Sequence, residues 1–360
     1  MGRYRIAVLA GDGIGPEVVA EALKVLRAGA DPARLALDFD LAETGAGCYQ
    51  RTGEDLPRET LEVSQAADAI LFGAAGLPEV RLPDGTEVAP QLTLRVLLDL
   101  YIGLRPIKLY PGVRSPLRLA EAERVDYVIL RENTEGLYAS RGAGVRVGNQ
   151  VVTDTLVVTR AGTARICRQA FDLARRRAGA PRDGQRRVTC VDKSNVLKSY
   201  AFFRAVFDEV AADYPEVEAE HAYIDAMAMY LVQAPSRYDV IVAENMFGDI
   251  LSDLAAATVG GLGLAPSGDI GDHCGLFQPS HGTAPDIADK GVANPLATIL
   301  SAALMLDWLG RRTGDGDAEA AARRIEAAVA AVLAAGRVLT PDLGGSASTA
   351  AVGDAVAAAL

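Results

Sequence analysis

The stretch VLAGDGIGPEVVA, residues 8–20, decides how the chain begins. An apolar run from Ile6 to Ala10 meets three glycines at alternate positions and then Pro16. Because proline suits the first turn of a helix, this pattern predicts a strand, a tight turn and a helix. The glycine spacing does not match the G-x-G-x-x-G loop of Rossmann folds, and no acidic residue ends a second strand where it would hold a ribose. A tight turn is therefore favoured over a phosphate-binding loop.

Composition narrows the class of protein. The chain has 360 residues, half of them hydrophobic, which is long enough to favour two domains. The net charge of −11 argues against a nucleic-acid partner, because phosphate binding needs a basic face. No apolar run approaches the roughly 18 residues of a membrane span. The four cysteines form no C-x-x-C pair and no secretory signal is present, so we expect reduced thiols in the cytoplasm.

Strand-like and helical segments alternate along the chain. Short apolar strands end in polar residues at DYVILREN, RRVTCVDK, EAEHAYID and DVIVAEN, which predicts an α/β protein with buried strands. The stretch GNQVVTDTLVVTR, residues 148–160, has β-branched alternation and predicts an extended arm or a hairpin.

Acidic residues gather near residue 250. Asp249 and Asp253 are spaced i and i+4, which places them on one face of a helix about a turn apart. Asp225 follows a strand and precedes an apolar helix. Three hard oxygen ligands would suit Mg²⁺ or Mn²⁺. The alternative is a solvated helix start whose dipole favours Asp249.

Several cations follow predicted strands or helices. Arg95 and Arg105 are ten residues apart, close to three helical turns, and Arg131 ends a strand. Three arginines at such ends could bind carboxylates, although each alone could be an ordinary surface residue. Lys193, which follows a strand, could carry a proton or form a salt bridge, and the lone His281 could be structural.

Seven ordered motifs resemble those of the β-decarboxylating dehydrogenases, the family of isocitrate, 3-isopropylmalate, homoisocitrate, and tartrate or D-malate dehydrogenases. They are GDGIGPE, LDLY with LRP, RENTEGLY, DAMAMYLV, NMFGDILSDLAA, HGTAPDIADKGVANP and ILSAALML, and they extend over almost the whole chain. The resemblance implies a two-domain α/β/α sandwich that is not a Rossmann fold. Its cofactor-side domain comprises residues 1–107 and 260–360, and its substrate and dimerisation domain comprises residues 108–259 with an arm near 145–160.

The resemblance also implies a cofactor site. NAD would be held by the segment from His281 to Asn294, which includes Ala284. The backbone around Gly282 and Thr283 would face the adenosine half and Asn294 the adenine, and Asn195 would lie near the nicotinamide. Asp286 would accept ribose hydroxyls and repel a 2′-phosphate, whereas NADP-using relatives carry a lysine-tyrosine pair at this position and the next.

Roles for the remaining site residues follow from the same resemblance. Arg95, Arg105 and Arg131 would bind the carboxylates of a 3-substituted (R)-malate, and Asp225, Asp249 and Asp253 would hold Mg²⁺ or Mn²⁺. Lys193, paired with Asp225, would accept the hydroxyl proton, and Tyr138 would protonate the enol after CO₂ leaves. Because Lys193 and Asp225 reach the partner's site in this family, we expect a homodimer interlocked by the arm. The resemblance leaves open whether K⁺ is also required and whether the oligomer is larger.

The substrate is the least determined feature. Ala89 and Gln91 stand where isocitrate enzymes place serine and asparagine, and only Leu92 remains of the leucine pair typical of isopropylmalate enzymes, with Val88 in place of their acid. Val196 adds a further apolar contact to this mixed pocket. A 3-alkylmalate such as 3-isopropylmalate is expected, with tartrate or D-malate, isocitrate, homoisocitrate or a specialised 3-alkylmalate as alternatives.

Two other functions remain open on the sequence. A non-catalytic regulatory subunit of the same fold would have lost site residues, whereas this chain keeps the complete arginine, tyrosine, lysine and aspartate set. A metal-dependent alcohol dehydrogenase that does not decarboxylate would not need the Tyr138 and Lys193 pattern.

Overall fold

The computed structural model describes residues 2–31, 33–120 and 123–360 and divides the chain into two compact units. Unit 1 comprises Met1–Leu100, Tyr110–Arg114 and Gly260–Leu360, and unit 2 comprises Tyr101–Leu109 and Ser115–Val259. The sequence placed the first boundary at residue 107, inside the strand β4 (Ile102–Lys108). The structure assigns β4 to unit 2 because it pairs along its whole length with β5 (Asp126–Glu132).

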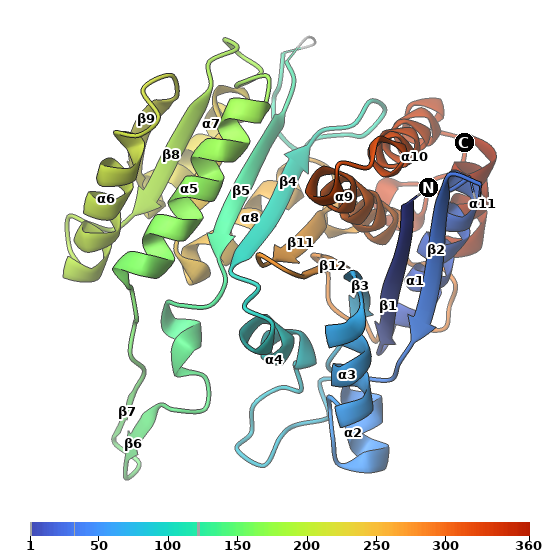
Figure 1. Ribbon diagram of the computed structural model, residues 1–360, viewed down its shortest axis with the longest axis horizontal. Helices are drawn as coiled ribbons and strands as arrows, with labels where there is room; N and C mark the ends of the chain where they lie inside the picture. Colours follow the sequence, from blue (N-terminus) through green and yellow to red (C-terminus); the bar gives the residue numbers. More distant parts are fainter. Residues whose placement is uncertain (1, 32, 121–122) are drawn as a thin grey trace. The chain divides into compact units, whose positions relative to one another are not determined.

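Unit 1 is a mixed sheet with helices on both faces (Figure 1). Its strands lie in the order β2-β1-β3-β12-β11, and only the β11–β12 pair is antiparallel. The strands are β1 (Gly2–Gly11), β2 (Leu35–Leu41), β3 (Ala69–Ala74), β11 (Pro266–Ile270) and β12 (Gly275–Pro279). The helices are α1 (Gly15–Gly29), α2 (Ala46–Thr52), α3 (Arg58–Ala66), α4 (Pro90–Leu97), α9 (Leu296–Thr313), α10 (Gly316–Ala335) and α11 (Thr349–Ala358), with short 3₁₀ turns at Leu262–Leu264 and Pro341–Leu343.

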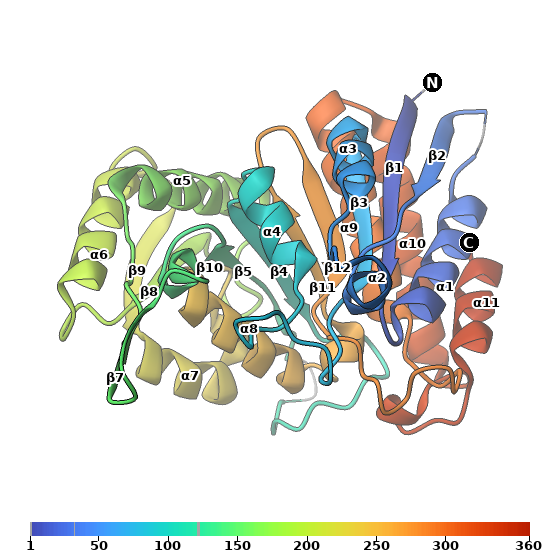
Figure 2. The ribbon, with the colours of Figure 1, turned by 90° about the horizontal axis from the view of Figure 1, so that it is seen from below.

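Alternation along β1 and β3 explains why unit 1 needs helices on both faces. Ala7 and Leu9 point to one face, where they join Phe72 in a core that α3 and α4 cover. The intervening residues Ile6 and Val8 are also buried, so the other face is closed as well, on the side of α1 and α9 (Figure 2). The continuous apolar runs seen in the sequence are those of strands buried on both sides.

Unit 2 repeats this layered plan with different strands. Their order is β4-β5-β10-β8-β9, and only β4 runs antiparallel to its neighbour. The remaining strands are β8 (Arg187–Asp192), β9 (Glu218–Tyr223) and β10 (Val240–Ala243). The helices are α5 (Arg160–Arg176), α6 (Lys198–Ala211), α7 (Ile224–Gln233) and α8 (Asn245–Thr258), with 3₁₀ turns η1 (Leu137–Ser140) and η2 (Pro235–Arg237). The predicted α/β class is therefore confirmed in both units.

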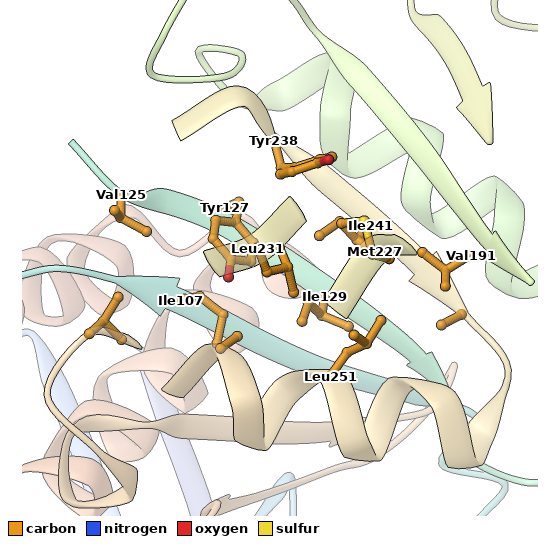
Figure 3. Close-up of a cluster of buried hydrophobic side chains, with 13 residues drawn as sticks. Ile107, Val125, Tyr127, Ile129, Val191, Met227, Leu231, Tyr238, Ile241 and Leu251 are labelled. Carbon is orange, nitrogen blue, oxygen red and sulfur yellow. The ribbon is translucent and has the colours of Figure 1, made fainter. Parts of the chain in front are cut away.

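The core of unit 2 lies between its sheet and two helices. Figure 3 shows Ile129 and Ile241 of neighbouring strands facing Met227 and Leu231 of α7 and Leu251 of α8, all of them fully buried. The opposite face of the sheet is covered by α5 and α6, whose Phe171 and Phe207 rings lie 5.3 Å apart. Burial of each large apolar side chain contributes about 1.5–3 kcal/mol, so this core fixes the strand ends on which the candidate site is built.

Two segments of unit 2 differ from their neighbours. β9 is not an apolar buried strand as predicted, because its sequence EAEHAY contains two glutamates and a histidine and most of it is exposed at the end of the strand order. Residues 145–153 form the antiparallel hairpin of β6 (Val145–Val147) and β7 (Val151–Thr153), which projects from the body of unit 2 (Figures 1 and 2). Its valines are exposed. Among the described residues, no helix is long and apolar enough to cross a membrane.

Candidate active site

The carboxyl ends of three parallel strands gather polar residues at one edge of unit 2. Arg131 lies near the end of β5, Lys193 follows β8, and Asn245 begins α8 directly after β10. Because β5, β10 and β8 run parallel as neighbours, these ends lie at the same edge, where ligands bind in open α/β sheets.

Arg131 is the centre of the best-ordered part of this edge. Its side chain is only 2% exposed, and it forms an ion pair with Asp249 through Nη1. The Tyr138 hydroxyl donates to the other oxygen of Asp249 at 2.8 Å. The guanidinium also lies over the Tyr138 ring, 5.1 Å from its centre. The structure therefore brings three predicted site residues into direct contact.

A glycine makes this close approach possible. A Cβ built on Gly248 would lie 2.7 Å from Cβ of Arg131 and 2.8 Å from its Cγ. Gly248 is one residue before Asp249, so the absence of a side chain lets α8 pack directly on the end of β5. Any larger residue would separate Arg131 from Asp249.

The environment of Tyr138 keeps its hydroxyl protonated. Partial burial, the negative charge of Asp249 and the hydrogen bond to Asp249 raise the pKa of Tyr138, and Arg131 opposes the rise. A phenol with a raised pKa is a proton donor at neutral pH. The half-buried ring leaves the hydroxyl at the surface of the site, where a substrate could reach it.

Asp249 and Asp253 lie one turn apart on α8, as the sequence predicted. Partial desolvation and the charge of Asp249 raise the pKa of Asp253, and Arg105 and Arg131 oppose the rise. Two carboxylates that repel each other in this way form a hard oxygen donor pair, which suits a divalent cation. Within the described ranges, a single copy of the chain contains no cluster of three or more Asp, Glu, His or Cys side chains that could hold a metal ion.

Asp225 lies on α7, where it pairs with Lys193 across 2.6 Å. This hydrogen bond is the main cause that lowers the pKa of Asp225. The Lys193 ammonium also lies 6.0 Å from the centre of the Tyr223 ring, and the Lys193 side chain is 26% exposed. The lysine is thus partly buried beside a carboxylate, the arrangement expected from the sequence.

Two residues that the sequence analysis did not single out hold the turn that carries Lys193. Asp192 is completely buried and accepts two hydrogen bonds from Arg204, at 2.7 and 3.0 Å. Asp192 also accepts the backbone N–H of Ser194 at 2.8 Å. The signal in the sequence was an acid at the last position of a buried strand, where an unpaired charge would be costly.

Arg105 reaches the edge from a strand. It lies in β4 and is 5% exposed, and its charge acts on Asp253. The predicted spacing of three helical turns between Arg95 and Arg105 is wrong, because α4 ends at Leu97 and Asp99 then adopts a positive φ of 47°. The two arginines therefore belong to different elements.

Arg95 is buried in unit 1 at the end of α4. Its Nε donates to Asp269 at 2.9 Å, and Asp269 also accepts the side-chain amide of Gln278 at 2.8 Å. Asp269 is completely buried, so this ion pair fixes the orientation of the Arg95 guanidinium from inside the protein. The acid partner was not predicted, since it lies 174 residues away in the sequence.

The residues expected to determine substrate specificity differ in how far their side chains are buried. Gln91 and Leu92 are half-buried on α4, and the Gln91 Oε1 atom is buried without a hydrogen-bond partner in the described protein. Val196 is 67% exposed in the turn after β8. Val88, in contrast, is completely buried in a cluster with Ala46 and Val80, so its side chain offers no surface to a substrate.

In the opening GDGIGPE turn, a carboxylate of the turn itself accepts the nearby backbone N–H groups. The Asp12 carboxylate accepts the backbone N–H groups of Ala46, Gly47 and Gly76 at 2.6, 2.8 and 2.9 Å. Donors of this kind bind phosphate in nucleotide loops, but here a side chain of the turn itself occupies them. The tight-turn interpretation of residues 8–20 fits this arrangement.

The segment between β12 and α9 carries the predicted cofactor residues within unit 1. The Thr283 hydroxyl donates to the Gly76 carbonyl at 2.7 Å, and the Thr283 carbonyl accepts Ile14 N–H at 2.9 Å. This segment therefore lies against the opening turn. A Cβ on Gly282 would meet nothing within 4 Å, and Ala284 has a positive φ of 39°.

His281, Asn294 and Asp286 differ in how available they are to a ligand. Burial lowers the pKa of His281, and its buried Nε2 atom has no hydrogen-bond partner in the part of the chain described. This neutral, unpaired nitrogen fits a polar group of a cofactor. Asn294 instead accepts the backbone N–H of Leu296, the first residue of α9, and donates to Asp342 at 2.9 Å, whereas Asp286 is exposed. In unit 2, Asn195 is exposed in the turn that also holds Val196.

Comparison with known proteins gives a consistent result. A family model described as isocitrate/isopropylmalate dehydrogenase matches residues 5–356. A 3-isopropylmalate/3-methylmalate dehydrogenase of Methanocaldococcus jannaschii is 47% identical over 355 residues, which cover 98% of each chain. A 3-isopropylmalate dehydrogenase of Rhodococcus jostii is 45% identical over 367 residues, covering 99% of this chain and 100% of the relative. The crystal structure of an isocitrate dehydrogenase from Methylococcus capsulatus superposes with a TM-score of 0.87 at 38% identity, covering 100% of this chain and 99% of that one.

Proposed function

The chain belongs to the isocitrate/isopropylmalate dehydrogenase family and is a decarboxylating dehydrogenase, and on that premise we propose that it oxidises and decarboxylates a 3-alkyl-(R)-malate, with 3-isopropylmalate as its best substrate. The observation that carries this proposal is the contact of Arg131, Tyr138 and Asp249 at one strand edge of unit 2. It combines a cation that could bind a carboxylate, a phenol that could donate a proton and an acid that could hold a metal, and the proposed reaction uses all three kinds of group.

Three arginines would bind the substrate. Arg105 and Arg131 would bind one malate carboxylate, and Arg95 is the third arginine proposed to bind the substrate. All three are at most 5% exposed, and Arg95 and Arg131 are held by acids on the protein side. A buried guanidinium whose orientation is fixed in advance loses little freedom when a carboxylate binds.

Asp249 and Asp253, with Asp225 of a second copy of the chain, would hold Mg²⁺ or Mn²⁺. When bound there, the cation would supply charge that lowers the pKa of the substrate hydroxyl and stabilises the negative charge left after CO₂ leaves. The donor set fits such an ion, because the mutual repulsion of Asp249 and Asp253 is relieved by a cation.

Two side chains would move the protons. Lys193, which donates to the exposed carboxylate of Asp225, would take up the proton of the substrate hydroxyl as it passes one of its own protons to that carboxylate. Tyr138 donates its proton to C3 after decarboxylation, because its raised pKa keeps the hydroxyl protonated until the carbanion develops.

NAD is the proposed redox cofactor, and it supplies the hydride acceptor when bound. The segment from His281 to Asn294 would hold it, with the unpaired His281 Nε2 facing its polar groups. Asp286 is exposed, so its carboxylate could accept ribose hydroxyls, and its charge would repel the 2′-phosphate of NADP.

Substrate choice is proposed from three side chains and from the relatives. Leu92 and Val196 favour an apolar C3 substituent over a third carboxylate, and Ala89 lacks the hydroxyl with which the serine of isocitrate enzymes contacts that carboxylate. The Methanocaldococcus relative is named for both isopropyl and methyl substituents. Since one methylene contributes only about 1–3 kcal/mol of discrimination, we propose that this chain also accepts smaller 3-alkylmalates.

We further propose a homodimer with shared active sites. Met229, Tyr230 and Val232 of α7 are 48%, 38% and 45% exposed, and the valines of the β6–β7 hairpin are at least 49% exposed. Exposed apolar side chains in such number are typical of an interface. A second copy on this surface would bring its Lys193 and Asp225 to the site.

A substrate screen tests the proposal. NADH formation with Mg²⁺ or Mn²⁺ would be measured on 3-isopropylmalate, 3-methylmalate, isocitrate, homoisocitrate, D-malate and tartrate, with Arg131→Gln as the inactive control. We expect the highest kcat/KM with 3-isopropylmalate and a measurable rate with 3-methylmalate. A higher kcat/KM for isocitrate or tartrate would refute the assigned substrate, and no NADH with any of the six would refute the proposed activity.

A further inference from the structure

Asn245, the first residue of α8, is completely buried against Arg131. Its Oδ1 atom accepts two hydrogen bonds from one guanidinium, from Nε at 2.9 Å and from Nη2 at 2.7 Å. Two donors converging on one oxygen fix both the position of the guanidinium and the direction of its plane. The remaining nitrogen, Nη1, is thereby aimed at Asp249.

The other end of the same amide holds the segment that carries Tyr138. Asn245 Nδ2 donates to the backbone carbonyl of Glu135 at 3.0 Å. The next residue, Gly136, has a φ of 78°, and a Cβ built on it would lie 3.0 Å from Cβ of Asn245. The backbone at Glu135 and Gly136 therefore packs directly on Asn245. This contact fixes the position of the segment from which the Tyr138 side chain extends.

These contacts are not required for the helix itself. Glu244 is the N-cap of α8 and accepts Met246 N–H, so the helix start is satisfied without the amide. All three hydrogen bonds of the Asn245 side chain go to Arg131 and Glu135. A residue needed only for folding would more simply be apolar at a completely buried position.

We propose that Asn245 is a positioning residue that sets Arg131 and Tyr138 relative to each other, so that one buried amide serves both carboxylate binding and proton donation. The two groups that it orients meet at Asp249, which accepts from both of them. This inference rests on the proposed function, because it takes Arg131 as a substrate ligand and Tyr138 as the proton donor.

The two ends of the amide can be separated by mutation. Asn245→Ala removes both contacts. Asn245→Asp keeps an oxygen for Arg131 but replaces the N–H donor with an oxygen that faces the Glu135 carbonyl. Ser236→Ala is the matched control, since Ser236 is 6% exposed in the same unit and donates to Glu123 at 2.7 Å, but it precedes β10 whereas Asn245 follows it.

Two quantities are measured for each variant: KM for the hydroxy-acid, and the ratio of decarboxylation to reduction of the oxo-acid. In Asn245→Ala we expect KM to rise roughly tenfold or more, since hydrogen bonds to a charged group are lost, and the ratio to fall. In Asn245→Asp we expect KM within about threefold of the wild type but a ratio lowered about tenfold, because only the phenol is displaced. Ser236→Ala should change neither.

The inference is overturned if Asn245→Ala behaves like Ser236→Ala, or if KM and the ratio change together in Asn245→Asp. The aspartate variant alone decides the question should Asn245→Ala not fold. Tyr138→Phe and the wild type separate this inference from the proposed function. A wild type without NADH formation removes the function, whereas an active wild type whose ratio falls with Tyr138→Phe but not with Asn245→Asp removes only the role of Asn245.

Discussion

Replacing Asp12 with asparagine should lower the free energy of unfolding of unit 1 by about 2–4 kcal/mol. The carboxylate accepts three backbone N–H groups from two separate segments, and it is only 7% exposed. An asparagine oxygen can keep the Ala46 and Gly76 donors, but its amide N–H₂ then faces the N–H of Gly47. One buried donor without a partner costs about 1–3 kcal/mol, and the loss of charge on the other two bonds costs about 1 kcal/mol more.

The single tryptophan makes the assay specific for unit 1. Trp308 lies on α9, with its ring centre 5.7 Å from that of Phe277, so its fluorescence reports the unfolding of this unit in urea. Linear extrapolation for wild type, Asp12→Asn and Asp31→Asn gives the comparison. Asp31 is an exposed carboxylate that accepts one backbone N–H, so its variant should lose no more than about 0.5 kcal/mol. Equal losses in the two variants would refute the reasoning that Asp12 anchors the turn.

Four further outcomes follow from the site. Asp249→Asn should reduce metal-dependent turnover by orders of magnitude with unit 2 still folded by circular dichroism, and near-normal turnover would remove its assignment as a metal ligand. NADP⁺ should be a poor substitute for NAD⁺, and equal kcat/KM values for the two would contradict the role of Asp286. Tyr138→Phe should slow decarboxylation of the oxo-acid about 100-fold and its reduction much less; equal losses in both half-reactions would count against the phenol as donor. Burial raises the pKa of Glu244 above its ordinary 4.5, so the folded chain holds this proton more tightly than the unfolded chain. The free energy of unfolding of the wild type therefore falls as the pH rises from 4.5 through the raised pKa of the folded chain. Glu244→Gln lacks this titration, so its unfolding free energy relative to wild type should increase with pH there, and a difference that stays constant in urea titrations would show that the carboxyl is not perturbed.

Periodicity predicted the elements that are buried on both sides, because such strands leave long apolar runs in the sequence. It failed where exposure changes the pattern. β9 was expected to be apolar and is a charged strand at the end of the order, and the helix through Arg95 was extended too far because nothing local marks its end at Leu97. The positive φ of Asp99, which ends the helix, is adopted by a residue that is not glycine and therefore carries no compositional signal.

The site was predictable where a residue type alone implies chemistry. Acids spaced by one helical turn and a lysine after a strand are visible in a sequence, and Asp249 and Lys193 became candidates for the site in this way. Asn245 and Asp269 were not, because their importance lies in contacts that span 114 and 174 positions along the chain. A buried amide or acid becomes significant only when the fold shows which cation it faces.

The charged β9 strand limits how copies of this chain can associate. Glu218 and Glu220 lie two residues apart along it and form ion pairs with Arg187 and Arg237 of the same chain, so an identical strand added to this edge would have to pack against charged side chains. The desolvation of these charged groups discourages growth of the sheet from one molecule into the next. Open-ended fibres are thereby disfavoured at this edge, which agrees with the proposed closed pair formed through the helical and hairpin surfaces.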